Sequence, residues 1–194
     1  MKNNALYLEA AKIVENQISQ EIVDNYVAEL STYARGTKDP LYSVELMKGV
    51  MKNNALYLEA AKIVENQISQ EINTQVEKLC DYLMNNDNPK FAVDYVKYLN
   101  KDNSVFQKAV ETVMPLVEII EFAKEHSLSD DLDVVSLLRD EDELEHMQNV
   151  VTFMKYKIAL FTIDENGNIF DEDECLIENM GDLADTYDAL TYEA

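Results

Sequence analysis

The chain has 194 residues, 47% of them hydrophobic, and a formal net charge of -22 at pH 7. Four glycines and three prolines are too few for a collagen-like or low-complexity disordered chain. The charge is concentrated in residues 100–194, which contain 24 acidic and six basic residues. A strongly negative protein repels phosphate groups, so we expect no direct binding to nucleic acid or to anionic membranes. We expect basic protein surfaces as partners.

The cysteine count and the hydrophobic pattern favour a cytoplasmic setting. Cys80 and Cys175 are too few for a disulfide framework. No window approaches the roughly 18 apolar residues of a membrane span. Lys2, Glu9 and Lys12 interrupt the apolar core that a signal peptide needs. We therefore expect a reducing, intracellular environment.

A 22-residue stretch, MKNNALYLEAAKIVENQISQEI, occurs twice without change, at 1–22 and at 51–72. Its apolar residues recur mainly at intervals of three and four, the spacing of one helix face. In the first copy they are Leu6, Ala10, Ile13, Val14, Ile18 and Ile22. Perfect identity beside weaker similarity further on indicates either recent recombination between related repeats or re-use of an N-terminal segment, with the original chain then starting at Met51. The stretch is nearly charge-balanced, so we interpret it as a scaffold.

The two copies begin longer units that stay similar at a period of 49 residues. Each unit predicts a long helix, over about 4–34 and about 54–84, and then a tight turn and a shorter helix. A capping side chain followed by proline marks the start of each shorter helix, because proline at the first helical position lacks only an amide that is unpaired there anyway. These pairs are Asp39-Pro40 and Asn88-Pro89.

The repeat pattern fades in a third unit. Residues 101–113 still match the start of the second long helix, but Pro115 then interrupts the pattern. Proline removes an amide donor and crowds the preceding turn, so we expect the helix to kink or restart there. Ser127 or Ser129 is expected to cap the next element. One or two acidic helices are predicted over about 132–153.

The C-terminal segment changes character. Residues 158–163 favour a strand, Gly167 lies in a tight-turn signal, and Ile169-Phe170 provide a returning strand. Residues 172–194 then predict an acidic helix.

The predicted fold class is mainly α, with tandem helical-hairpin repeats of period about 49–50 packed as a small helical array. A short β-hairpin and an acidic helix lie near the C-terminus. The four predicted segments are 1–50 (first repeat), 51–99 (second repeat), 100–157 (a degenerate third repeat and acidic helices) and 158–194 (β-hairpin and acidic helix).

No catalytic motif is present. The chain lacks a glycine-rich phosphate loop, a Gly-x-Ser-x-Gly motif and a His-Glu-x-x-His motif. Glu143-x-x-His146 has the spacing used in di-iron helical bundles, but the second such motif is absent, because Ala123 stands three residues before His126. A solvated helix face is the preferred interpretation. We expect no enzymatic activity, no cofactor and no metal site.

Two further features have ordinary structural interpretations. Asp164 to Asn168 resemble a calcium loop, but Gly167 stands at the fourth position, whereas an EF-hand requires glycine at the sixth. A hairpin turn explains the same residues. Cys80 lies on the apolar face of the second long helix, where a buried structural thiol is expected instead of a nucleophile.

Three acidic runs are the sharpest chemical feature of the sequence. Self-repulsion among so many uncompensated carboxylates opposes folding, which favours a partner that neutralises them. The alternative is a solvated face that keeps the chain in solution. The predicted partner-binding residues are Asp130, Asp131, Asp133, Asp140, Glu141, Asp142, Glu143, Glu145, Asp171, Glu172, Asp173 and Glu174.

Two functional hypotheses follow. The first is a non-enzymatic inhibitor whose carboxylates imitate a row of phosphates and occupy the basic cleft of a nucleic-acid-binding enzyme, such as a host nuclease, CRISPR effector or regulator. The Asn- and Lys-rich, Trp-free composition resembles that of small proteins of low-GC phages, so a phage or mobile-element origin is expected. The alternative is a virion or assembly component whose repeats pack against neighbouring subunits. The oligomeric state stays open at this point.

Overall fold

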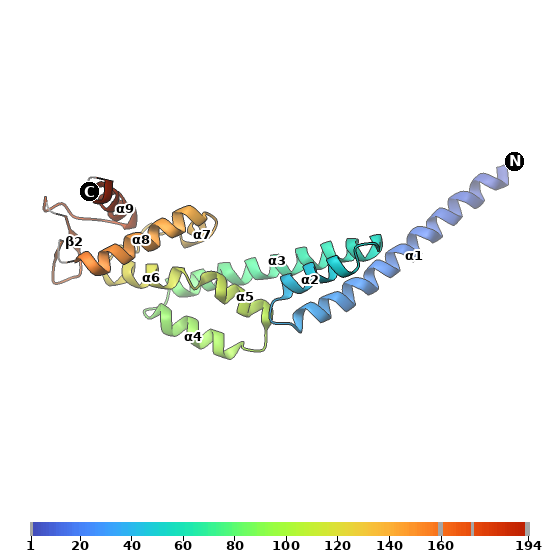
Figure 1. The fold of residues 1–194 in the computed structure, drawn as a ribbon, viewed down its shortest axis with the longest axis horizontal. Helices are drawn as coiled ribbons and strands as arrows, with labels where there is room; N and C mark the ends of the chain where they lie inside the picture. Colours follow the sequence, from blue (N-terminus) through green and yellow to red (C-terminus); the bar gives the residue numbers. More distant parts are fainter. Residues whose placement is uncertain (1, 159–160, 172, 193–194) are drawn as a thin grey trace. The chain divides into compact units, whose positions relative to one another are not determined.

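A computed structural model describes residues 2–158, 161–171 and 173–192 of the chain. This described part is mainly helical, as predicted, with nine helices and one two-stranded antiparallel hairpin (Figure 1). The chain divides into two compact units. Unit 1 comprises Met1–Thr74 and Lys101–Lys108, and unit 2 comprises Gln75–Asn100 and Ala109–Ala194. The four segments predicted from the sequence, and their organisation as a repeat array, stay predictions.

Unit 1 is built from long and short helices whose ends agree closely with the sequence pattern. Helix α1 spans Lys2–Arg35, α2 spans Pro40–Val50, and α3 spans Ala55–Met84, of which the residues up to 74 belong to unit 1. The Asp39 carboxylate accepts a hydrogen bond from the Tyr42 amide at 3.0 Å and caps α2, and this bond lowers the pKa of Asp39. The cap-and-proline signal is therefore confirmed at this helix.

The core of unit 1 lies where α1, α2 and α3 meet. Helix α2 packs against α1 (Figure 1), and both contribute buried side chains, among them Leu30 and Val44. The ring of Tyr26 in α1 packs edge-on against Tyr57 in α3, with centroids 5.1 Å apart. An ion pair of 2.7 Å between Arg35 and Glu71 joins the same two helices. Through these contacts the second identical segment, in α3, packs against the part of α1 that follows the first identical segment.

Unit 2 contains the rest of α3 and the remaining helices. Helix α4 spans Pro89–Leu99, with the Asn88 side chain accepting a hydrogen bond from the Phe91 amide at 2.9 Å. Helix α5 (Ser104–Val113) enters unit 2 at Ala109, and α6 spans Leu116–Glu125. Pro115 stands between α5 and α6 as the N-cap of α6. The predicted restart at this proline is confirmed.

The loop after α6 differs from the prediction in its capping residues. Helix α7 is a single turn, Val134–Leu137, and its cap is Asp133, which accepts a hydrogen bond from the Ser136 amide at 2.9 Å. Ser127 instead adopts a positive φ of 58° within the loop. The expectation that Ser127 or Ser129 caps the next helix was wrong, because the chain needs several more residues to turn before α7 begins.

Helix α8 spans Glu141–Lys157, packs on α6, and contacts α9 (Met180–Tyr192) (Figure 1). The β-hairpin lies between α8 and α9. Strand β1 (Thr162–Ile163) pairs antiparallel with β2 (Ile169–Phe170). Of the first predicted strand, residues 159–160 lie outside the described part.

The turn of the hairpin is held by one carboxylate and one glycine. Asp164 accepts hydrogen bonds from the amides of Asn166 and Asn168 at 2.8 and 2.9 Å. Gly167 has a φ of +87°, a conformation that side chains with a Cβ rarely adopt. The turn signal at these residues is confirmed, and it accounts for the carboxylate that resembled a calcium ligand.

The last helix begins eight residues later than predicted. Helix α9 spans Met180–Tyr192, whereas the sequence predicted a start at residue 172, and the predicted residues 193–194 lie outside the described part. Asp171 accepts hydrogen bonds from the amides of Asp173 and Cys175, which turns the chain, and Leu176 forms a β-bridge with Phe170. An Asx-type turn satisfies the backbone amides locally and so competes with helix formation. The described residues of the third acidic run, Asp171, Asp173 and Glu174, therefore lie in a turn.

Candidate functional site

The first acidic run lies in the loop between α6 and α7. Asp130 and Asp131 are exposed, and Asp131 has a positive φ of 63°. Asp133 is also exposed and caps α7. Only the last of the three carboxylates therefore has a local structural task, and the other two face solvent.

The second acidic run forms the beginning of α8. Asp140 caps this helix and accepts a hydrogen bond from the Glu143 amide at 3.1 Å. Glu141, Asp142 and Glu143 occupy the first helical turn, where negative charge interacts favourably with the helix dipole. Glu145 follows and is exposed. Part of this run is thus explained by helix formation alone.

The structure brings the first run together with one residue of the second run around a cavity of about 300 Å³. Three loop carboxylates, Asp130, Asp131 and Asp133, line this cavity together with Glu143 of α8. Asn179 and the first residues of α9 complete the lining. Residues that are separated by an intervening short helix in the sequence therefore share one concave surface.

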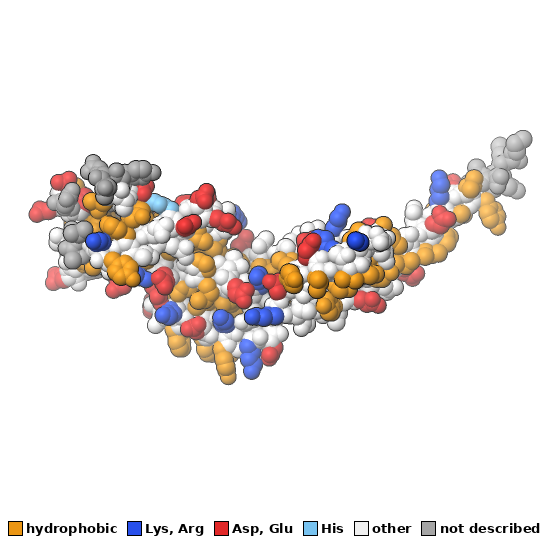
Figure 2. Space-filling model, viewed as in Figure 1, with side chains coloured by type: hydrophobic (Ala, Val, Ile, Leu, Met, Phe, Trp, Pro, Cys, Tyr) orange, Lys and Arg blue, Asp and Glu red, His pale blue; other side chains and the backbone are white. Residues whose placement is uncertain are grey.

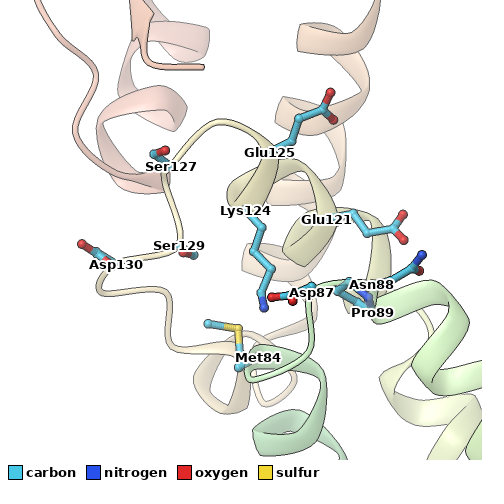
Figure 3. A pocket seen from close by; sticks show the side chains of 10 residues that line it. All are labelled: Met84, Asp87, Asn88, Pro89, Glu121, Lys124, Glu125, Ser127, Ser129 and Asp130. Carbon is cyan, nitrogen blue, oxygen red and sulfur yellow. The ribbon is translucent and has the colours of Figure 1, made fainter. Parts of the chain in front are cut away.

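A second cavity, of about 720 Å³, is lined by Ser127, Ser129 and Asp130 of the same loop and is shown in Figure 3. Figure 3 shows the Lys124 side chain directed toward Asp87 and Met84, whereas Glu121 and Glu125 point away from it. The Lys124 ammonium group donates a hydrogen bond to the Asn86 carbonyl at 2.8 Å. The ammonium group of Lys124 is therefore already hydrogen-bonded to the backbone at the edge of the second cavity.

We define the acidic hollow as the carboxylates that line these two cavities, which share Asp130. Its members are Asp87, Glu121, Glu125, Asp130, Asp131, Asp133 and Glu143. Lys124 is the only basic residue that lines either of these two cavities. The carboxylates around the two cavities make this part of unit 2 strongly negative, and such a surface attracts cationic side chains, although the Glu121 and Glu125 side chains point away from Lys124 (Figure 3).

Sequence reasoning missed three members of this surface. Asp87 falls within the tight turn predicted before Asn88-Pro89, and Glu121 and Glu125 were not singled out from the sequence. Glu121 and Glu125 are four residues apart and therefore lie on one face of α6, which was the available signal. Asp87 carried no such signal, because its place beside α6 depends on the fold of unit 2.

Several predicted residues do not line the hollow. Asp140, Glu141, Asp142 and Glu145 lie on α8 or at its cap but line neither cavity. In the third run, Asp173 and Glu174 are exposed, whereas Asp171 is half-buried and holds its turn. The predicted residue Glu172 lies outside the described residues.

The described carboxylates of the three acidic runs are not neutralised by ion pairs within the chain. Among the residues that the structure describes, no salt bridge includes a member of the three acidic runs. The nearby bases pair elsewhere, with Lys155 lying 2.9 Å from Glu118 and Arg139 lying 3.8 Å from Glu77. The negative charge of the runs thus stays available to an external partner.

The groups that resembled metal sites have other partners. The His146 ring packs edge-on against Tyr187, and its Nε2 atom lies 3.6 Å from Asp188 of α9. His126 Nδ1 lies 3.2 Å from the Gly167 carbonyl oxygen. Within the described ranges, no three His, Cys, Asp or Glu side chains converge as a metal-binding group.

The two cysteines differ sharply in accessibility, and a labelling experiment tests this difference. Cys80 is buried, and desolvation raises the pKa of its thiol to about 11, whereas Cys175 is exposed. Because the thiolate is the reactive form, we expect a maleimide to modify Cys175 and to spare Cys80 in the folded chain. Mass spectrometry of peptides before and after denaturation measures this. Equal modification of both thiols in the native chain would contradict the buried placement of Cys80.

No helix in the parts of the chain described by the structure has an apolar stretch long enough to cross a bilayer. Comparison of the chain with protein-family models, with curated proteins and with solved structures returns no match.

Proposed function

We propose that this chain is a non-enzymatic interaction protein whose carboxylate-rich surface in unit 2 occupies a basic, nucleic-acid-binding surface of another protein. The observation that carries the proposal is the acidic hollow, in which seven carboxylates and one engaged lysine line two cavities that share Asp130. Rows of carboxylates imitate phosphates electrostatically, so arginine and lysine side chains that bind nucleic acid also suit this surface. An inhibitor encoded by a phage or mobile element is the corresponding biological role.

Affinity capture with the full chain as bait tests the proposal. Capture from a bacterial lysate at low salt is expected to retain a basic, nucleic-acid-binding protein, because exposed charges attract over about 10 Å at 0.1 M salt. High salt or an excess of duplex DNA is expected to release that protein. Capture that is unchanged by both treatments would refute the electrostatic mechanism.

A matched pair of variants separates the acidic hollow from net charge. The first variant combines Asp130→Asn, Asp131→Asn, Asp133→Asn and Glu143→Gln, which removes four charges from the hollow and keeps a side-chain oxygen at the α7 cap. The control removes four exposed charges outside the hollow, from α1, α3 and α4: Glu29→Gln, Glu59→Gln, Asp81→Asn and Asp94→Asn. We expect the first variant to lose capture by at least about tenfold, since each charge-assisted pair is worth about 1.5–3 kcal/mol. Equal losses in both variants would mean that net charge, and not the hollow, determines binding.

The exposed apolar face of α1 favours a second candidate function, a virion or assembly component. Figure 2 shows hydrophobic side chains along α1, and Tyr7, Val14 and Ile18 on this helix are exposed. An assembly component would use such a face to pack against neighbouring subunits. Incorporation of the chain into particles, assayed by co-sedimentation, would favour this alternative over the inhibitor.

A further inference from the structure

One amino-acid sequence occurs in this chain in two different environments. In the second identical segment, one helix face is buried within unit 1 and consists of Tyr57, Ala60, Ala61, Val64, Ile68 and Ile72. In the first segment, the same positions define what we call the α1 stripe: Tyr7, Ala10, Ala11, Val14, Ile18 and Ile22. All of these are exposed except Ile22, which is half-buried. The same side chains are therefore covered in one copy and open to solvent in the other.

The difference is large for the residues at the centre of the stripe. The exposed fraction is 52% at Val14 against 0% at Val64, and 52% at Ile18 against 0% at Ile68. Tyr7 is 81% exposed, whereas its counterpart Tyr57 is 7% exposed and packs against Tyr26. The second copy thus demonstrates that this sequence forms a close-packed helix interface when another helix lies against it.

No described part of unit 1 is free to cover the α1 stripe in the way that the second copy is covered. The helices that cover the second copy carry Tyr26, Arg35 and Lys48, which contact Tyr57, Glu71 and Glu65 respectively. Their packing surface is therefore already occupied by residues 57–72. A first segment from another chain would have to displace an identical segment there, which exposes one stripe for each stripe that it covers and yields no net burial.

We infer that two copies of this chain associate through their α1 stripes, as an antiparallel helix pair. Tyr7, Ala11, Val14 and Ile18 follow each other at intervals of four, three and four, the spacing of a two-helix seam. In an antiparallel pair, Tyr7 lies opposite Ile18 of the second chain and Ala11 lies opposite Val14. Each layer then joins a larger side chain to a smaller one, and the alanines allow close approach.

The charge distribution along α1 favours the antiparallel arrangement. Glu9 and Lys12 offset each other near the start of the helix, whereas Glu15, Glu21 and Asp24, which lie further along it, are all acidic. Antiparallel pairing places the acidic part of one helix beside the start of the other, where the helix dipole is positive. Parallel pairing would place like charges side by side. Residues 1–22 carry two basic and three acidic residues, so the strongly negative remainder of the chain lies outside the contact.

Sedimentation velocity over a wide range of protein concentrations tests the inference, which does not rest on the proposed function. We expect the wild-type chain to form a dimer and the double variant Val14→Asp with Ile18→Asp to stay monomeric with unchanged helix content. The matched control, Lys12→Gln with Asn16→Asp, makes the same change in net charge on the opposite face of α1 and is expected to dimerise. A wild-type chain that is monomeric throughout, or a double variant that still dimerises, would overturn the inference.

Disulfide trapping tests the direction of pairing in a Cys175→Ser background. The double variant Tyr7→Cys with Ile18→Cys is expected to form covalent dimers on mild oxidation. The single variant Tyr7→Cys is not, because antiparallel helices hold the two introduced thiols roughly 16 Å apart, beyond the reach of a disulfide. Efficient trapping by the single variant would show parallel pairing and overturn the antiparallel arrangement.

Discussion

Replacing Ile68 with alanine is expected to lower the free energy of unfolding by about 2–5 kcal/mol, whereas the same replacement at Ile18 changes it by no more than about 0.5 kcal/mol. Ile68 is fully buried in unit 1, so its loss removes apolar contacts and leaves a cavity. Ile18 is exposed on α1. Urea unfolding followed by circular dichroism at low protein concentration measures both values.

The two substitutions form an unusually clean comparison. Ile18 and Ile68 occupy the same position in identical 22-residue segments, so the local effect of alanine on helix propensity is the same in both. The difference between the two changes in unfolding free energy therefore reports tertiary packing alone. Equal effects would mean that the stripes are covered to the same extent in solution, against the exposures described above. If Ile18→Ala destabilises only at high protein concentration, the association through α1 is its cause.

Replacing Gly167 with alanine is expected to lower the free energy of unfolding by about 1–3 kcal/mol, because a side chain in this conformation is strained. A Cβ atom at Gly167 would also lie 2.7 Å from the Glu125 carbonyl oxygen, which belongs to the backbone and cannot turn aside as a side chain would. The substitution therefore forces the hairpin turn away from the end of α6. Thermal and urea unfolding of the variant measure the loss.

Gly49 provides the control with the opposite sign. It lies within α2, and a Cβ atom there would meet nothing within 4 Å. Replacing it with alanine is expected to raise the free energy of unfolding by about 0.5–1 kcal/mol, because alanine has the higher helix propensity and a less flexible unfolded state. If both variants were destabilised to the same degree, close approach at Gly167 would not be the cause.

Local hydrogen bonds explain both the helix starts that were predicted and the one that was missed. The starts of α2 and α4 were predicted from Asp39-Pro40 and Asn88-Pro89, because an N-cap side chain acts on the amides of neighbouring residues. The start of α9 was mistaken, because Asp171 holds a turn with the amides of residues 173 and 175. An acidic run followed by apolar residues resembles a helix start unless this competing turn is known.

The candidate surface was predicted in part. The first acidic run was identified from its composition, but its placement beside Glu143 around the smaller cavity depends on how α6, α8 and α9 pack. Asp87 joins the same surface from a turn that comes more than thirty residues earlier in the chain. The composition showed where in the sequence the excess negative charge lies. Which of these carboxylates line the same cavities depends on how unit 2 folds.

The sequence by itself determined where most helices begin and end, because caps, prolines and the turn glycine act within a few residues of their own position. It also indicated that both identical segments are helical with an apolar face, although α1 begins at Lys2 and α3 only at Ala55. The buried face in the second copy includes Tyr57 and Ala61 instead of the expected counterparts of Leu6 and Ile13. Only the tertiary structure decided which stripe is buried. Burial depends on whether another element of the chain lies against a helix face, and two identical sequences cannot encode that difference locally.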